Sequence, residues 1–187
     1  MRSYAPYDRK KQGSDAGKKK ERKDRSAEEW DLRIDCTMAY AEEIVQNLMR
    51  SSSVLEYALV SGIEKGDSEA LSHGSKENHV HIALVFKYKL RRDQALATCR
   101  GLLKKTDEYA VPRNSRFPYA GWFLHHTKAD WKLIKEPYIR YEFGLLPRDP
   151  VDDDTKKIVQ RMFKKFGTGG STEQENDNRQ RFAEWLE

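Results

Sequence analysis

The segment HVHIALVFK, residues 79–87, constrains the fold of this chain more than any other feature. It is an almost unbroken apolar run of the length of one strand, which is typical of a strand inside a sheet. Its two histidines, His79 and His81, lie two residues apart and therefore point to the same face, while the aliphatic residues between them point to the other. We therefore expect a central strand with two imidazoles on one face and a hydrophobic core behind the other.

The hydrophobic periodicity of the remaining chain supplies the partners of this strand. In chain order we expect a strand at 30–36, a helix at 40–49, strands at 56–63 and 79–87, a helix from Leu90 to Leu103 and a short strand at 108–111. Residues 120–126 (AGWFLHH) are compatible with helix or strand, and YIRYEFG favours a closing strand. The β-α-β-β-α-β order predicts an α+β fold, a ferredoxin-like or RRM-like central antiparallel sheet with helices on one face.

Charge and composition divide the chain into segments. Residues 1–25 hold ten basic and four acidic side chains and almost no aliphatic ones, so we expect residues 1–28 to form a disordered basic arm. A basic arm on a nearly neutral body suggests contact with a polyanion. No apolar run is long enough for a membrane span, no signal region is present, and Cys36 and Cys99 form no CxxC pair, which favours a reducing compartment.

The carboxyl-terminal segment has a different pattern from the domain expected at 29–150. Residues 151–166 have helical periodicity, GTGGSTEQENDN is typical of a flexible linker, and RQRFAEWLE begins another helix. We interpret 151–187 as a helical linker towards a missing downstream domain. The full-length protein is expected to form oligomers through that domain.

The histidine pair is half of a divalent-metal site. Glu64 ends the preceding strand, and an antiparallel pairing across the intervening loop would bring its carboxylate beside the histidines. Glu77 is the reserve ligand. The alternative interpretation is that the two histidines lie on a solvent-facing surface by chance and that Glu64 is a solvated residue at a strand end.

His79-Val80-His81 within an apolar strand, preceded by a strand ending in Glu64, resembles the HUH endonuclease domain of rolling-circle replication initiators. These Rep proteins belong to circular single-stranded DNA viruses or small plasmids, and the resemblance covers residues 30 to about 147. It implies that the domain nicks and joins single-stranded DNA at an origin stem-loop. A Mg²⁺ or Mn²⁺ ion on His79, His81 and Glu64 would activate the phosphate, and a tyrosine would attack it to form a 5′-phosphotyrosine.

The resemblance also implies a position for the nucleophile, because the family places a tyrosine three residues before a lysine or histidine. Residues 122–128, WFLHHTK, resemble this motif with Phe123 in the position of the tyrosine and His126 or Lys128 as the basic helper. Phenylalanine has no hydroxyl, so either residue 123 has lost the nucleophile or another tyrosine attacks. The alternatives are Tyr138 or Tyr141, then Tyr119 or no nucleophile at all. The other interpretation of Trp122 and Phe123 is plain core packing.

Basic and aromatic residues near these motifs suit phosphate contact and base stacking on a single strand. The candidate DNA-binding residues are Lys87, Lys89, Arg91, Arg92, Arg113, Arg116 and Trp122. The KKKERK run of the arm has three interpretations: a nuclear localisation signal, a DNA contact or a solubilising tail. A viral protein of a eukaryotic host would act in the nucleus, and otherwise in the cytoplasm.

Two other functions compete with a replication initiator. A non-catalytic single-stranded nucleic-acid-binding module would use the same sheet, but it would have no role for His79 and His81. A transposase or relaxase of a mobile element would share the HUH chemistry. The chain has no GxxxxGK[ST] motif, so we expect no helicase activity from it.

Overall fold

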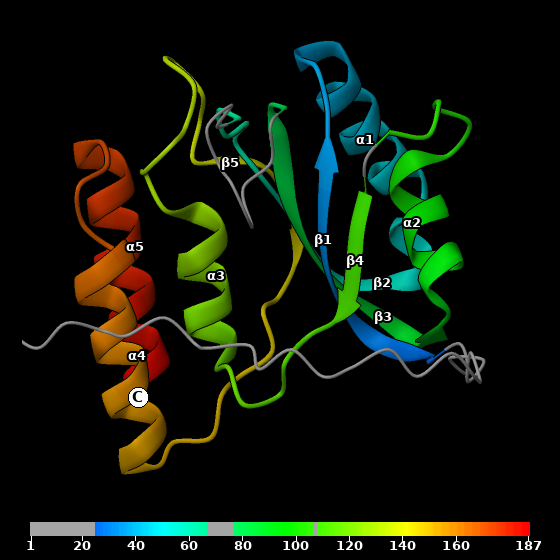
Figure 1. Cartoon of the computed structure of the whole chain (residues 1–187). Coiled ribbons are helices and arrows are strands. Elements are labelled where there is room, and N and C mark those ends of the chain that lie inside the picture. The colour runs from blue at the N-terminus through cyan, green and yellow to red at the C-terminus, as the bar shows by residue number, and fades with distance from the viewer. Residues whose placement is uncertain (1–24, 67–76, 107) are drawn as a thin grey trace, which may run out of the picture.

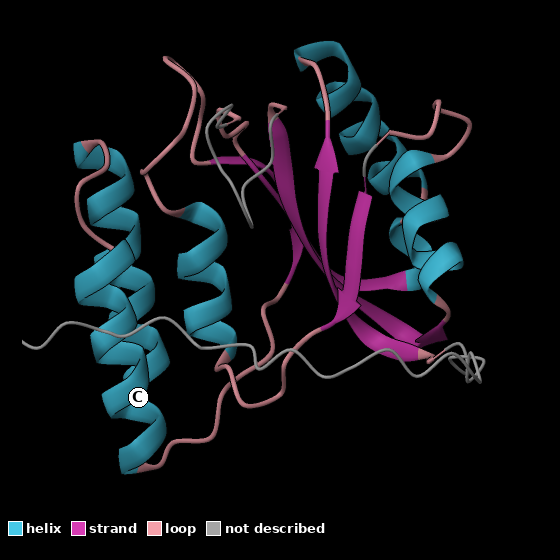
Figure 2. Ribbon diagram, in the orientation of Figure 1, coloured by secondary structure: helices cyan, strands magenta, loops and turns pink. Residues whose placement is uncertain are grey.

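The computed structural model describes residues 25–66, 77–106 and 108–187, and these residues form five strands and five α-helices (Figures 1 and 2). The elements are β1 (Ala27–Asp35), α1 (Met38–Arg50), a 3-10 turn (Ser52–Val54), β2 (Leu55–Ser61), β3 (His79–Leu90), α2 (Arg92–Arg100), β4 (Glu108–Pro112), α3 (Tyr119–Thr127), β5 (Ile139–Gly144), α4 (Asp153–Phe166) and α5 (Thr172–Leu186).

The five strands form one antiparallel sheet in the order β4-β1-β3-β2-β5. The strand that contains the histidines is therefore central, between β1 and β2. In this register Asp35 lies opposite His79, and Arg33 lies opposite His81. The predicted α+β fold with a central antiparallel sheet is confirmed.

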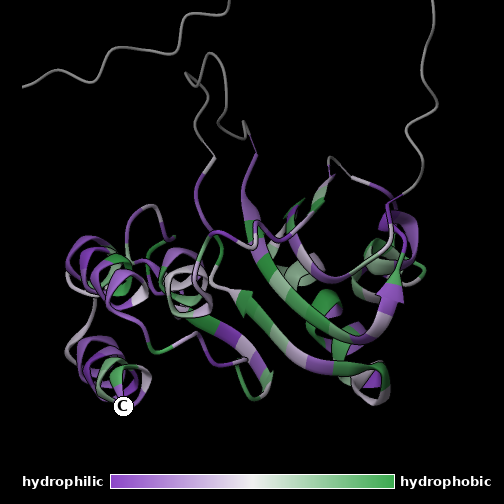
Figure 3. Cartoon of the chain, turned by 90° about the horizontal axis from the view of Figure 1, so that it is seen from below, coloured by the Kyte–Doolittle hydropathy of each residue, from purple (hydrophilic) through white to green (hydrophobic). Residues whose placement is uncertain are grey.

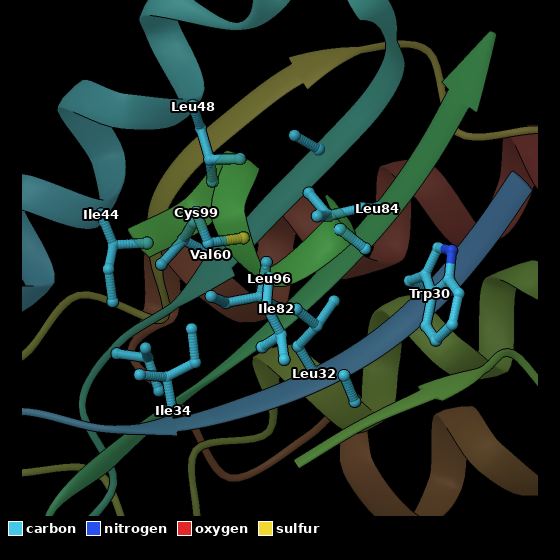
Figure 4. Close-up of a cluster of buried hydrophobic side chains, with 14 of the residues drawn as sticks. Trp30, Leu32, Ile34, Ile44, Leu48, Val60, Ile82, Leu84, Leu96 and Cys99 are labelled. Atoms are coloured by element: carbon cyan, nitrogen blue, oxygen red, sulfur yellow. The ribbon is translucent and has the colours of Figure 1, made fainter. Parts of the chain in front are cut away.

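One face of the sheet is covered by α1 and α2, as the sequence predicted. Alternate residues of the central strands point into this core, including Leu32 of β1, Val60 of β2 and Ile82 of β3, each with no exposed surface. Ile44 and Leu48 of α1 meet them from the helical side (Figure 4). Burying each such side chain contributes about 1.5–3 kcal/mol, so this layer holds the sheet in one register.

The opposite face is covered by α3, which in turn packs against α4 and α5 (Figure 1). The expectation of helices on one face did not include this layer. Tyr57, Leu59, Ala83 and Val85 bury their side chains on this face, which explains why β2 and β3 are apolar at consecutive positions. The sheet strands are mostly hydrophobic, whereas α4 and α5 are mostly hydrophilic (Figure 3). The face under α3 carries the histidines.

The segment interpreted as a flexible linker is largely helical in the structure. Only 167–171 connect α4 to α5, and the TEQENDN residues form the first turns of α5. Ser171 caps this helix by accepting a hydrogen bond from the Gln174 amide at 3.2 Å, and the Gln174 side chain donates to the Thr127 carbonyl at 2.7 Å. Tertiary contacts therefore select a helix that the polar composition did not indicate.

Two other expectations concern the ends and loops of the chain. Most of the basic arm (1–24) and most of the 66–76 loop lie outside the described residues, and β1 begins at Ala27, inside the segment assigned to the arm. The ambiguous residues 120–126 form the helix α3. Of the helices that the structure describes, none has the length and apolarity needed to cross a membrane.

Candidate metal centre

The first residue of β3 and the segment after β2 bring Glu64 and His79 face to face. The Glu64 amide donates to the His79 carbonyl at 2.8 Å, and the His79 amide donates to the Glu64 carbonyl at 3.1 Å. This isolated antiparallel bridge extends the β2–β3 pairing beyond the end of β2. The predicted antiparallel arrangement of the two segments is therefore present.

The three predicted ligands converge in this corner. Oε2 of Glu64 lies 3.6 Å from Nε2 of His79 and 3.3 Å from Nε2 of His81. One ligand atom from each residue falls within 4.8 Å of the others, so the group could hold a metal ion. Glu64 is only 4% exposed and His79 only 8%. The surrounding protein therefore holds these two side chains in position before any ion binds.

Neighbouring groups orient the ligands. The Nδ1 atom of His79 lies 3.0 Å from the carbonyl oxygen of Glu77, an atom that can only accept a hydrogen bond. The proton of His79 therefore belongs on Nδ1, and the Nε2 lone pair points towards Glu64 and His81. Glu77, the reserve ligand, contributes this backbone oxygen to the site.

Protonation states in the corner also suit a metal site, which requires neutral imidazoles and an ionised carboxylate. Burial lowers the pKa of His81 to about 4, which outweighs the opposite effect of Glu64. For Glu64, burial acts to raise the pKa, but its contacts with His79 and His81 and the charge of Lys132 together hold the pKa well below its usual range. At neutral pH the carboxylate is charged and His81 is neutral.

Two lysines share the second oxygen of Glu64. Nζ of Lys128 lies 2.7 Å and Nζ of Lys132 lies 2.8 Å from Oε1. Both side chains are nearly buried, and burial lowers the pKa of Lys132 despite the opposite charge of Glu64. Lys128 was predicted as a basic helper and does reach the site. Lys132 was missed, because nothing in ADWKLIK distinguishes it from a solvated lysine.

The carboxyl-terminal end of α3 places two more imidazoles beside His81. The His126 ring centroid is 5.7 Å and the His125 centroid 6.2 Å from that of His81. Burial lowers the pKa of His125 to about 4. His125 was not singled out from the sequence, although the adjacent pair of histidines at the end of an apolar segment was the available signal.

His126 is fully buried and is held at both ring nitrogens. Nδ1 lies 2.8 Å from the Trp122 carbonyl oxygen, and Nε2 lies 3.1 Å from Oδ1 of Asp31 on β1. Hydrogen bonds from His126 are among the causes that lower the pKa of Asp31 against the effect of burial. These two contacts tie α3 to the sheet.

The contacts of the favoured nucleophile position lead away from the triad. Phe123 packs against Trp185 at a ring distance of 5.5 Å, and the Arg181 guanidinium lies 4.5 Å above its ring. Its side chain therefore packs between α3 and α5, and the residues that it contacts there are not those of the triad. The structure supports core packing for this position.

The tyrosine alternatives have partners elsewhere. The hydroxyl of Tyr138 donates to Asp177 of α5 at 3.0 Å, and burial together with that hydrogen bond raises its pKa to about 12. Tyr141 packs on the α1 and α2 side of the sheet, opposite the histidines. The hydroxyl of Tyr119 is hydrogen-bonded to Glu29.

The predicted DNA-binding residues fall into two groups. Lys87, Lys89, Arg91 and Arg92 lie at the far end of β3 and the start of α2, and Lys87 is about 20 Å along the strand from His81. Arg113 and Trp122 line a cavity next to His125, and Arg116 is exposed nearby. The second group is the one that the fold brings towards the triad.

Comparison with family models, curated proteins and solved structures finds no match to this chain.

Proposed function

We propose that this chain is a metal-dependent enzyme that cleaves and rejoins a phosphodiester bond of single-stranded DNA, with Mg²⁺ or Mn²⁺ bound by Glu64, His79 and His81. The proposal is of the HUH class, and a replication initiator is the biological role that we favour. It rests on the arrangement of charges around Glu64.

One carboxylate at this site faces two ammonium groups and two imidazoles. The corner is therefore positive before a divalent cation enters, and the cation adds two further charges. Such a site needs an anionic partner to complete it, and Mg²⁺ in proteins is commonly held by one or two carboxylates together with substrate phosphates. This observation carries the proposal. Two lysines on the single carboxylate of the triad weaken its attraction for a cation, and they become useful only when a substrate anion binds beside the metal.

The residues of the chain have separate roles in this proposal. His79 and His81 present Nε2 lone pairs, and Glu64 presents Oε2, on one side of the metal position. Lys128 and Lys132 are close enough to move from Glu64 to a non-bridging oxygen of the phosphate. In that position their positive charges would stabilise the negative charge that develops on the phosphoryl group. The bound ion would supply Lewis-acid polarisation of the phosphate.

A second function, binding of a single strand without cleavage, is favoured by one observation. Among the described residues, the hydroxyls of Tyr57, Tyr119 and Tyr138 are hydrogen-bonded to carboxylates outside the triad. To act as a nucleophile of the HUH type, any of these three tyrosines would have to change partner. Cleavage with a metal-activated water would not require this change.

The test is a cleavage assay on an end-labelled hairpin library with a randomised single-stranded loop, because the origin sequence is unknown. The full chain is incubated with Mn²⁺ or with EDTA, and the products are separated under denaturing conditions that reveal both cut DNA and a protein–DNA adduct. His81→Ala removes a ligand, and Lys87→Ala, at the far end of β3, is the matched control.

We expect Mn²⁺-dependent cleavage that His81→Ala abolishes and Lys87→Ala retains. A covalent adduct would indicate a tyrosine nucleophile, and cleavage without an adduct would indicate water. DNA binding without cleavage under any condition would overturn the enzymatic proposal in favour of the binding module, and cleavage that persists in His81→Ala would overturn the assignment of the triad.

A further inference from the structure

The connection between α3 and β5, residues 128–138, runs beside the candidate metal centre. Lys132 of this connection forms an isolated antiparallel bridge with Glu64 and places its Nζ 2.8 Å from Oε1 of that residue. The bridge continues for one more residue, because the Lys65 amide donates to the Trp131 carbonyl at 2.8 Å. Figure 1 shows the connection projecting from the end of α3 before the chain returns to the sheet. Trp131 is therefore held directly next to the proposed phosphate contact.

This connection carries two large apolar side chains that do not pack into either core. Trp131 is 65% exposed and Ile134 is 93% exposed. The other three tryptophans of the chain differ from Trp131, since Trp30 and Trp122 are fully buried and Trp185 packs on α3. A single exposed apolar residue needs no explanation, but an exposed indole is the largest apolar side chain that a protein can present to solvent. Its position therefore does not follow from the packing of the fold.

The backbone of the connection gives a second, independent sign that the exposed indole has a use. Trp131 has a φ of 70° and Lys135 a φ of 66°, and these are the two residues other than glycine with a positive φ among those that the structure describes. A bulky residue in this conformation costs free energy, and such residues concentrate at functional sites. Glycine would adopt the same conformation without the cost. The presence of tryptophan here indicates that its side chain is needed at the surface.

We infer that Trp131 stacks on one base of the single-stranded DNA, beside the nucleotide whose phosphate occupies the metal centre. This inference rests on the proposed function, from which it takes its substrate class. A phosphate at Lys132 and the adjoining base would meet consecutive residues of one connection. Stacking on exposed aromatic rings is the general way in which proteins hold unpaired bases.

The charged residues near the indole fit a polyanionic strand. Lys65 and Lys135 are exposed on either side of Trp131 in the fold. Asp130 is an exposed acid of the same connection, whereas the carboxylate of Glu136 is bound by Arg140 at 2.6 Å. The exposed charges therefore favour an anion, which suits contacts with the phosphates that flank a stacked base.

The experiment compares two strands of equal charge that differ in their bases. Fluorescein-labelled octathymidylate and an abasic strand of the same length are titrated by anisotropy in EDTA, so that neither metal nor cleavage contributes. We expect the wild type to bind octathymidylate more tightly. Trp131→Gly should weaken that binding about tenfold and leave the abasic strand unaffected. Tyr88→Ala, which removes an exposed aromatic ring at the far end of β3, is the control and should change neither affinity.

Two further measurements separate stacking from an effect on folding. Trp131→Gly should melt at or above the temperature of the wild type, because glycine relieves the positive φ. A lower melting temperature would contradict the strained backbone on which the inference depends. Unlabelled octathymidylate should quench the tryptophan fluorescence of the wild type. Trp131→Phe should bind within about threefold of the wild type, since it keeps a stacking ring, but it should lose the quenching.

The outcomes distinguish this inference from the proposed function. If octathymidylate binds to Trp131→Gly as it does to the wild type, the inference is wrong and the catalytic proposal is unaffected. Equal binding of both strands by the wild type, or no binding of octathymidylate, would overturn the inference and leave cleavage to be judged by its own assay. If Trp131→Gly alters only the sedimentation of the protein, the loop contacts protein and the inference is wrong. If the expected losses appear but no DNA is cleaved with Mn²⁺, the stacking inference stands and the enzymatic proposal fails.

Discussion

Glu64→Gln provides the sharpest test of the electrostatics at the candidate metal centre. The change keeps the shape of the side chain and removes the charge that Lys128 and Lys132 contact at 2.7 and 2.8 Å. Because both lysines are nearly buried, loss of the carboxylate leaves two ammonium groups with a neutral partner. Breaking a buried ion pair in this way destabilises a protein by about 3–5 kcal/mol. We expect a loss near the lower end of this range, because the glutamine oxygen can still accept a hydrogen bond from one lysine.

The pH dependence of the free energy of unfolding gives a second, independent estimate of what the Glu64 charge contributes. The pKa of Glu64 is held far below its ordinary value of 4.5, so the folded protein keeps this carboxylate ionised at pH values where the unfolded chain binds a proton. The contribution is complete above pH 4.5 and falls as the pH drops below it. A difference of one bound proton corresponds to about 1.4 kcal/mol per pH unit. From pH 4.5 to pH 3 the stability difference between wild type and Glu64→Gln should therefore shrink by about 2 kcal/mol.

The assay is urea denaturation of both proteins without metal, at several pH values from 7 to 3. Glu56→Gln makes the same substitution at an exposed position of β2 and serves as the control for the loss of a carboxylate. Parallel profiles for wild type and Glu64→Gln below pH 4.5 would show that Glu64 takes up a proton in the folded state as readily as in the unfolded chain. That result would contradict the ion pairs on which the proposed charge balance depends.

Four other perturbations test the metal centre and its surroundings. Mn²⁺ at 100 times its dissociation constant should stabilise the wild type by about 2.7 kcal/mol in a thermal melt, and His79→Ala should lose this stabilisation. Because the pKa of His81 is about 4, Mn²⁺ affinity measured by calorimetry should decrease as the pH falls through 4, where a proton competes for the imidazole. Gly62→Ala should lower both stability and Mn²⁺ affinity, since its Cβ would lie 1.9 Å from the Pro137 carbonyl oxygen, and unchanged melts would contradict the close approach of these two segments. Phe123→Tyr should destabilise the protein by about 1–3 kcal/mol in urea, because its hydroxyl would enter the apolar contact with α5. The variant should form no DNA adduct, and an adduct would show that residue 123 takes part in the reaction.

Much of the fold could be predicted from local sequence patterns, which do not depend on how the helices and strands pack together. The alternation around Trp30 and the helical stripe of Ile44 and Leu48 predicted β1 and α1 within a few residues. The segment 120–126 remained ambiguous because it is apolar on every side. It became a helix because one side packs on the sheet and the other on α4, a choice that no local pattern contains.

The candidate metal triad was predictable for a related reason. Two residues of period-two spacing share a face of a strand, and an antiparallel neighbour across a loop returns to the same end, so His79, His81 and Glu64 could be grouped before their positions were known. Lys132 could not be grouped with them. It reaches Glu64 only because the chain after α3 folds back to form a bridge with that residue, and its own surroundings in the sequence resemble those of any surface lysine.

The sequence by itself determined the order of strands and helices from β1 to β4, the central position of the histidine strand and the three candidate ligands, because hydrophobic periodicity and strand geometry are local properties. The tertiary structure alone decided which side chains surround those ligands. It buried Phe123 against α5, tied His126 to Asp31, brought two lysines to Glu64 and left the Trp122 N–H facing no acceptor among the described residues. These contacts join residues that are far apart in the chain, and their energies depend on burial and on the direction of each side chain, which are properties of the packed molecule.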